Sequence, residues 1–93
     1  MSYSLAFLPS ALKEWEKLGA TLRAQFKKKL AERLEHPRVE ADALRGMADH
    51  YKIKLRAAGY RLVYRVEDTT ITVVVVAVGK RERGEVYEAA KRR

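Results

Sequence analysis

The spacing of apolar residues changes along the chain from the period of a strand to that of a helix and back. Residues 3–8, YSLAFL, alternate loosely and predict a first strand that ends at Pro9. In the second half of the chain, alternation returns and predicts three more strands, at about residues 50–57, 60–67 and 70–78. Two segments between these regions carry apolar residues at the spacing of a helix face.

The first of these segments predicts a short amphipathic helix. Leu12, Trp15 and Leu18 share one face. Ser10 is the expected N-cap, and Gly19 is expected to end the helix.

The second segment predicts a longer helix that returns alongside the first. Thr21 is its expected N-cap, and Pro37 closes it. Its apolar stripe consists of Leu22, Phe26, Leu30 and Leu34. Because the connection between the two helices is only a few residues long, we expect an antiparallel helical hairpin. Residues 38–50 have weak periodicity and predict a loop with one turn of helix at most.

The last predicted strand, within ITVVVVAV, is apolar on both faces, which is typical of a central strand that is covered on both sides. Residues 81–93 predict a C-terminal helix over the second face, weakened by Gly84 in its interior. An even number of helices between the first two strands predicts that these strands run antiparallel. The sequence therefore predicts one α+β domain over residues 1–93. It consists of a four-stranded antiparallel sheet with an N-terminal helical hairpin on one face and a C-terminal helix.

The two strands around Gly59 predict a hairpin whose apolar residues face the helices. Placing these residues on one side pairs Leu55 with Leu62 and Arg56 with Arg61. This register excludes a three-residue loop. It leaves a two-residue turn at Ala58 and Gly59, or a four-residue turn around them.

The net charge of the chain indicates which class of partner the protein binds. Lys and Arg number 20 against 12 Asp and Glu, which gives a net charge of +8 and a pI near 10.0. Such a balance indicates a polyanionic partner, with nucleic acid first, an anionic membrane surface second and an acidic protein third. The only long apolar run has nine residues, too few to span a bilayer as a helix.

Other chemistry is disfavoured by composition. The chain has no cysteine, and its N-terminus lacks the pattern of a signal peptide, so we expect a cytoplasmic protein without disulfides. His36 and His50 are not in metal-ligand spacing. We therefore expect no metal and no cofactor.

Strand alternation gathers the basic residues of the hairpin on the face opposite its apolar residues. The residues concerned are Lys52, Lys54, Arg56, Arg61 and Arg65. Neighbours on one face lie about 5 to 7 Å apart, so the like charges repel, and no acidic residue alternates with them. A solvated sheet face that resists aggregation is one interpretation. A surface that binds phosphates is the interpretation that the missing acids favour.

Three segments together resemble the RelE family of toxins from bacterial and archaeal toxin–antitoxin modules. These segments are ALKEWEKLG, LRGMADHYKIKLRAAGYRLVYRV and VGKRERGEVY, in the same order and spacing, and the resemblance runs over nearly the whole chain. It implies a ribosome-dependent endoribonuclease that cuts mRNA in the ribosomal A site. It also implies a RelB-like antitoxin as partner, besides the ribosome and the mRNA.

Site residues follow from the positions that match the family's motifs. The resemblance implies a catalytic set of Lys52, Lys54, Arg61, Arg81 and Tyr87, and a further basic residue near it, Arg45. The basic face and the segment after the last strand extend the expected RNA-binding set with Arg56, Arg65, Lys80 and Arg83.

These residue types can support RNA cleavage by attack of the 2′-OH. Lysine crowded by other cations loses its proton more readily, so Lys52 or Lys54 can serve as base or acid. Arginine stays protonated and supplies fixed charge to the phosphorane, an effect worth about 10²- to 10³-fold in rate per donor. Tyr87 can orient or deprotonate the 2′-OH.

Two other functions stay open at this point. A related toxin of the same fold poisons DNA gyrase and would not need the five residues of the catalytic set. A basic module that binds RNA or the ribosome without cutting is the third possibility.

Overall fold

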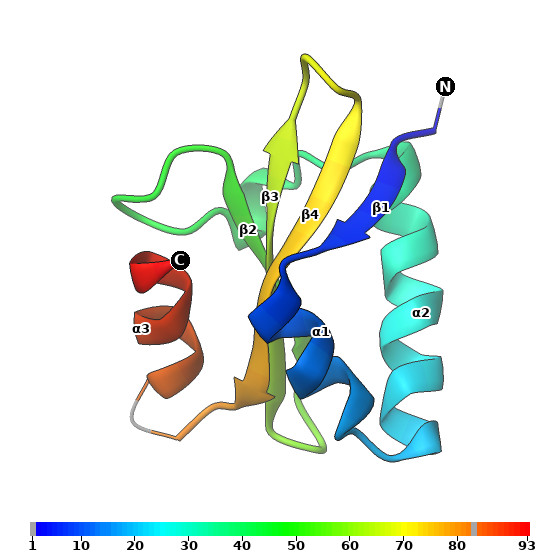
Figure 1. Ribbon diagram of the computed structural model, residues 1–93, viewed down its shortest axis with the longest axis vertical. Coiled ribbons are helices and arrows are strands. Elements are labelled where there is room, and N and C mark those ends of the chain that lie inside the picture. Colours follow the sequence, from blue (N-terminus) through cyan, green and yellow to red (C-terminus); the bar gives the residue numbers. More distant parts are fainter. Residues whose placement is uncertain (1, 83) are drawn as a thin grey trace.

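The computed structural model describes residues 2–82 and 84–93, which form one sheet with helices on both of its faces (Figure 1). In chain order, the elements are β1 (Ser4–Phe7), α1 (Pro9–Glu16), α2 (Ala20–Glu35), the 3-10 turn η1 (Glu40–Asp42), β2 (His50–Leu55), β3 (Tyr60–Glu67), β4 (Thr72–Lys80) and α3 (Glu85–Arg92). The predicted α+β class with four strands is confirmed.

The sheet is mixed, so the prediction of a wholly antiparallel sheet is wrong. The strand order is β1-β4-β3-β2, and β1 runs parallel to β4, whereas the other two pairings are antiparallel. Only Leu8 separates β1 from α1, and its backbone N–H still donates to Val75 O, 3.0 Å away. The chain therefore enters α1 without turning back, and only α2 reverses its direction before β2 (Figure 1).

Both predicted N-caps are wrong. α1 begins at Pro9 with Leu8 as its N-cap, so Ser10 lies inside the helix. Proline suits the first helical position because its φ is preset and its missing N–H has no helical partner there. Gly19 is the N-cap of α2 instead of Thr21, while α2 ends at Glu35, before Pro37, as predicted.

The larger part of the core lies between the sheet and the helices α1 and α2. Phe26 is fully buried there, and its ring lies 6.2 Å from that of Trp15. The sheet contributes Tyr51, Ile53, Leu55, Leu62, Tyr64, Val66, Val73, Val75 and Val78. The predicted core positions of Trp15 and Phe26 are confirmed, but Leu12 is 41% exposed and Ala11 takes its place.

A smaller apolar cluster lies between the sheet and α3. Its fully or almost fully buried members are Val63, Val76, Ala77, Val86 and Ala90. Val63 pairs with Ala77 and Tyr64 pairs with Val75, so β4 carries one extra residue, Val76, at this point. This β-bulge lets two consecutive residues face α3.

The hairpin between β2 and β3 has a four-residue loop, one of the two predicted lengths, but the loop spans residues 56–59 and the register differs from the prediction. Leu55 pairs with Tyr60, and Lys54 pairs with Arg61, so the predicted pairing of Leu55 with Leu62 is wrong by two residues. A shift of two leaves every side chain on its predicted face. Gly59 occupies the loop with a φ of +70°, a conformation that favours glycine.

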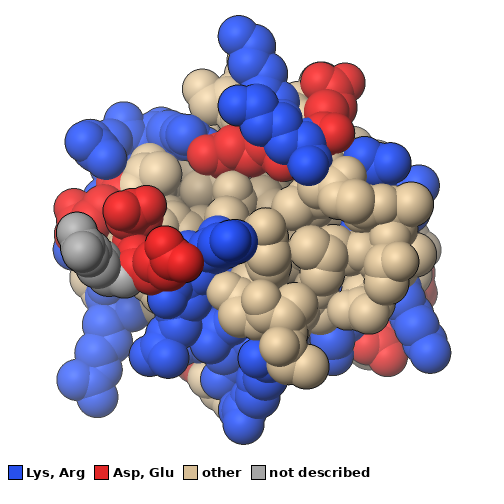
Figure 2. Space-filling view, turned by 90° about the horizontal axis from the view of Figure 1, so that it is seen from below, with Lys and Arg blue, Asp and Glu red and all other residues tan. Residues whose placement is uncertain are grey.

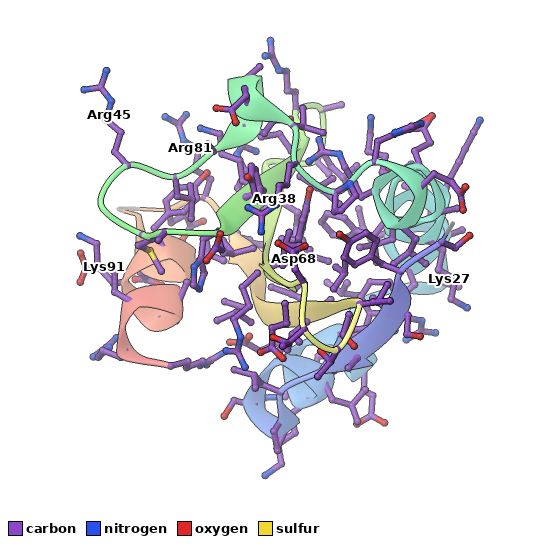
Figure 3. All side chains as sticks on the ribbon, turned by 90° about the horizontal axis from the view of Figure 1, so that it is seen from above. Lys27, Arg38, Arg45, Asp68, Arg81 and Lys91 are labelled. Atoms are coloured by element: carbon purple, nitrogen blue, oxygen red, sulfur yellow. The ribbon has the colours of Figure 1, made fainter. Side chains whose placement is uncertain are left out.

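Arg38 joins the loops at the end of the sheet where β1 and β2 begin and β3 ends. Its Nη1 donates to Asp49 at 2.8 Å, and its Nη2 donates to Asp68 at 2.7 Å. Tyr3 donates to the other oxygen of Asp68 at 2.7 Å. Figure 3 shows Arg38 and Asp68 close together. These exposed bonds hold four separate segments at one point.

Acid should remove the stabilisation that Asp68 supplies. Hydrogen bonds from Tyr3 and then Arg38 lower the pKa of Asp68 below the ~3.9 of an unfolded chain. A lowered pKa stabilises the folded state above about pH 3.9, and this contribution disappears as the pH falls through the folded pKa. Urea unfolding should therefore show Asp68→Asn less stable than the wild type at pH 7, with the difference shrinking as the pH falls below about 3.9. The exposed Glu16→Gln is the control. A difference that persists unchanged in acid would contradict this assignment.

Candidate functional site

An open pocket of ≈ 450 Å³ lies on the side of the sheet that faces α3. It is lined by Leu44, Lys52, Lys54, Arg56, Arg61, Arg81 and Tyr87. The structure thus brings the five residues expected to be catalytic into one pocket, although they come from β2, β3, the segment after β4, and α3. We call these lining residues the cationic pocket.

Strand pairing places the three cations of the sheet. Lys54 lies directly opposite Arg61, and Lys52 lies opposite Val63, so all of them project to the side of α3. Directly opposed Cβ atoms lie about 4.5 to 5.5 Å apart. Both lysines are half-buried. The alternation of basic and apolar residues along β2 and β3 therefore accounts for the floor of the pocket.

Arg61 is the most buried of the cations. It is only 7% exposed, and its Nη1 donates to Tyr60 O at 3.0 Å. Its Nε is buried and has no hydrogen-bond partner within residues 2–82 and 84–93. A desolvated guanidinium with an unused donor favours an anion.

Arg81 reaches the pocket because the tip of the hairpin holds its backbone. The N–H of Arg81 donates to Gly59 O at 2.8 Å, which ties the segment after β4 to the loop between β2 and β3. The side chain of Arg81 is exposed (Figure 3). Within the described part of the chain, the cations of the pocket form no ion pair with a carboxylate.

Tyr87 is delivered by α3. The helix begins after Gly84, which has a φ of +69° as N-cap, so the expectation of Gly84 in a helix interior is wrong. Val86 and Ala90 face the sheet. Tyr87 packs against the same cluster while it lines the pocket. Acidic residues in the first turn of α3 and basic residues in its last turn interact favourably with the helix dipole.

The other expected RNA-binding residues are distributed differently. Arg45 is exposed on the loop before β2 and points away from the molecule (Figure 3). Arg65 forms a 2.7 Å ion pair with Glu67. Lys80 lines one hollow beside Tyr60 and α1 and another beside α3, and it does not line the cationic pocket. Arg83 lies outside the described residues.

Leu44 is a lining residue that the sequence did not single out. It lies in the loop before β2, and its N–H donates to His50 O at 3.0 Å. Its position in the quoted LRGM segment was the only signal available, because an isolated leucine in a loop carries no periodicity. It gives the pocket an apolar wall beside Tyr87.

Positive charge continues from the cationic pocket around the edge of the sheet. A second, larger hollow of ≈ 710 Å³ shares Lys54 and Arg56 with the pocket and adds Lys29 and Arg33 from α2, of which Arg33 is paired with Asp42 at 2.6 Å. Seen from below, Lys and Arg side chains line much of the rim of the molecule around an uncharged area (Figure 2). A chain of phosphates could therefore contact cations well beyond the pocket itself.

Comparison with known proteins agrees with this fold. A family model for the ParE toxin of the type II toxin–antitoxin system parDE matches residues 5–84. The chain is 62% identical over 93 residues to the mRNA interferase toxin RelE of Escherichia coli K12, covering all of this chain and 98% of that protein. The chain therefore belongs to the RelE/ParE family of type II toxins. Its near relatives in that family are RelE toxins, which are named mRNA interferases.

Solved structures agree in shape. A double arginine-to-alanine variant of E. coli RelE in the free state has a TM-score of 0.92 and 60% identity, covering 99% of this chain and 97% of that one. RelE in the intact E. coli RelBE toxin–antitoxin complex has a TM-score of 0.85 and 62% identity, covering 88% of this chain and 100% of that one. An archaeal RelE from Pyrococcus horikoshii, at 20% identity and a TM-score of 0.65, shares the fold. No helix in the described residues is long and apolar enough to cross a membrane.

Proposed function

We propose that this chain is the toxin of a type II toxin–antitoxin system and cuts mRNA in the ribosomal A site without a metal. The observation that carries the proposal is the cationic pocket, in which two lysines, three arginines and a tyrosine meet with no carboxylate partner among the described residues. Full-length identity of 62% to an mRNA interferase supports the same activity.

The proposed reaction is attack of a ribose 2′-OH on the adjacent phosphorus. The 2′-oxygen–phosphorus bond forms, the bond from phosphorus to the 5′-oxygen breaks, and the products are a cyclic phosphate and a 5′-hydroxyl. Of the pair Lys52 and Lys54, one lysine, as the neutral amine, takes the proton of the 2′-OH, and the other, as the ammonium, gives a proton to the leaving 5′-oxygen. Arg61 and Arg81 stabilise the charge on the phosphorane, and Tyr87 orients the 2′-OH.

Outside the pocket, the proposed roles are binding roles. Arg56 contacts the backbone of the bound RNA at the rim of the pocket. Arg45, Arg65, Lys80 and Arg83 are proposed as contacts to RNA farther from the cut. A RelB-like antitoxin is the proposed partner of the toxin, and acidic segments in it would be attracted by the net charge of +8.

Cleavage should require the ribosome. The pocket has no histidine or glutamate pair, so a substrate that the ribosome has already bent and oriented should gain far more rate than free RNA does. Primer extension on purified translating ribosomes should show a cut within the A-site codon, and the same mRNA without ribosomes should stay intact.

Two variants sharpen this experiment. Lys52→Ala combined with Lys54→Ala should abolish the cut, whereas Lys13→Ala on the outer face of α1 should not. Rapid metal-free cutting of free RNA would contradict ribosome dependence. Translation arrest without any cut would indicate a binding module, and gyrase-dependent DNA breaks without RNA cleavage would indicate the gyrase-poisoning alternative.

A further inference from the structure

Part of the β4 edge is covered by side chains instead of a strand. β1 pairs with β4 only along Thr72–Val75, so the following residues have no strand on that side within the described chain. Glu14 Oε1 accepts a hydrogen bond from Val78 N at 3.0 Å. Arg93 Nη1 donates to Val76 O at 3.0 Å. Two side chains from distant parts of the sequence therefore satisfy backbone groups that a neighbouring strand would otherwise pair with.

The same two side chains bind each other. Arg93 Nη1 donates to Glu14 Oε1 at 2.8 Å, and Nη2 donates to Oε2 at 3.1 Å, which is a two-pronged contact between guanidinium and carboxylate. The side chains are 23% and 33% exposed. The hydrogen bond to Glu14 raises the pKa of Arg93. Since planar forks of this kind are geometrically specific, the pair fixes an orientation as well as a distance.

The pair joins the two layers of helices around the edge of the sheet. Glu14 belongs to α1, on the face of the large core, and Arg93 directly follows α3, on the opposite face (Figure 1). Among the described residues, the other ion pair of α3 joins Lys91 to Glu88 at 3.9 Å, within the helix and largely exposed. That second pair cannot hold the helix to the rest of the protein.

α3 needs such an attachment. It has eight residues, fewer than an isolated helix needs to be stable in water. Its buried residues, Val86 and Ala90, are small and remove little apolar area from water. Tyr87 lies on this helix, so the position of the Tyr87 ring depends on how firmly α3 is docked.

We propose that Glu14 and Arg93 are positioning residues that hold α3 across the β4 edge and thereby fix Tyr87 in the cationic pocket. Neither residue lines the pocket, so each acts through α3 and not on the RNA. The effect on cleavage rests on the proposed function, whereas the docking of α3 can be measured without any RNA.

Amide exchange tests the docking. Arg93→Ala should speed exchange in residues 85–92 about 10- to 100-fold, as expected for the loss of hydrogen bonds between charged groups, while β3 keeps its protection. Arg93→Lys and Glu14→Gln should give intermediate rates because each keeps part of the contact. Lys91→Ala, which removes the exposed pair on the same helix, is the matched control. Unchanged exchange in Arg93→Ala would overturn the proposal.

Cleavage of ribosome-bound mRNA tests the effect on Tyr87. Arg93→Ala should lower the single-turnover rate with little change in the ribosome concentration that gives half the maximal rate. In a Tyr87→Phe background, the same change should have less than about a twofold effect, because the hydroxyl that it misplaces is already gone. An equal loss in both backgrounds would overturn the role of the pair in positioning Tyr87.

Failure of the proposed function would look different. If the wild type cut no RNA, the exchange rates would still decide whether the pair docks α3, and the NMR signals of the Tyr87 ring would report its position. Those signals should move towards the values of a flexible tyrosine in Arg93→Ala and stay in place in Lys91→Ala. Ring signals that do not move in Arg93→Ala would overturn the proposal independently of catalysis.

Discussion

Replacing Arg61 with methionine should lower the rate of cleavage on the ribosome about 10²- to 10³-fold and leave thermal stability unchanged or higher. Arg61 is 7% exposed, and the only bond that its guanidinium donates in the described structure goes to Tyr60 O. It lies opposite Lys54, so the free protein bears the repulsion of two neighbouring cations. The charge of Arg61 therefore destabilises the free protein and stabilises the transition state of cleavage.

Methionine suits this experiment because it fills much of the space of arginine without charge. Single-turnover cleavage gives the rate, and differential scanning calorimetry gives the stability. Arg92→Met, which removes a cation from the exposed side of α3, is the control for net charge. A melting temperature that falls by several degrees together with the rate would show that Arg61 is a structural residue.

Replacing Phe26 with alanine should have the opposite pattern, a loss of about 3–5 kcal/mol in the free energy of unfolding with little change in activity per folded molecule. Phe26 is fully buried and packs on Trp15 in the larger core, on the side of the sheet away from the cationic pocket. Removing its ring leaves a cavity that the surrounding helices and strands can only partly close.

Urea unfolding measures the stability loss, and cleavage is assayed at a temperature where the variant is still folded. Val86→Ala is the matched truncation on the other face, where it should loosen α3 without a comparable loss of global stability. A Phe26→Ala protein that is fully folded yet inactive would show that the large core communicates directly with the pocket.

Much of the pocket could be predicted from the sequence because strand alternation is a local property. Lys52, Lys54 and Arg61 each lie between two apolar residues in the sequence, so their common face follows from the period of two. The register error of two residues did not matter, since it preserves faces. Arg81 and Tyr87 lie outside regular strands, and only the family resemblance placed them in the set.

Some of the errors arise where contacts join distant segments, and others arise at the starts of the two helices. The direction of β1 depends on the absence of a turn at Leu8, which the apolar pattern does not reveal. The pairing of Glu14 with Arg93 spans almost the whole chain, and neither residue belongs to a periodic pattern. Ser10 and Thr21 have the right side chains for N-caps, but Pro9 and Gly19 start the helices earlier.

The bulge at Val76 decides which basic residue the pocket receives. Val75 and Val78 both face the large core, three positions apart, because the extra residue shifts the phase of the strand. In a strand without it, Lys80 would project towards α3 and Arg81 would project away. Arginine offers a planar fork of donors to a phosphate and lysine a single ammonium, so the two are not equivalent there. For the segment between Val75 and Arg81, natural selection should therefore conserve length more strictly than composition, and a single-codon deletion should be more damaging than any exchange of one aliphatic residue for another.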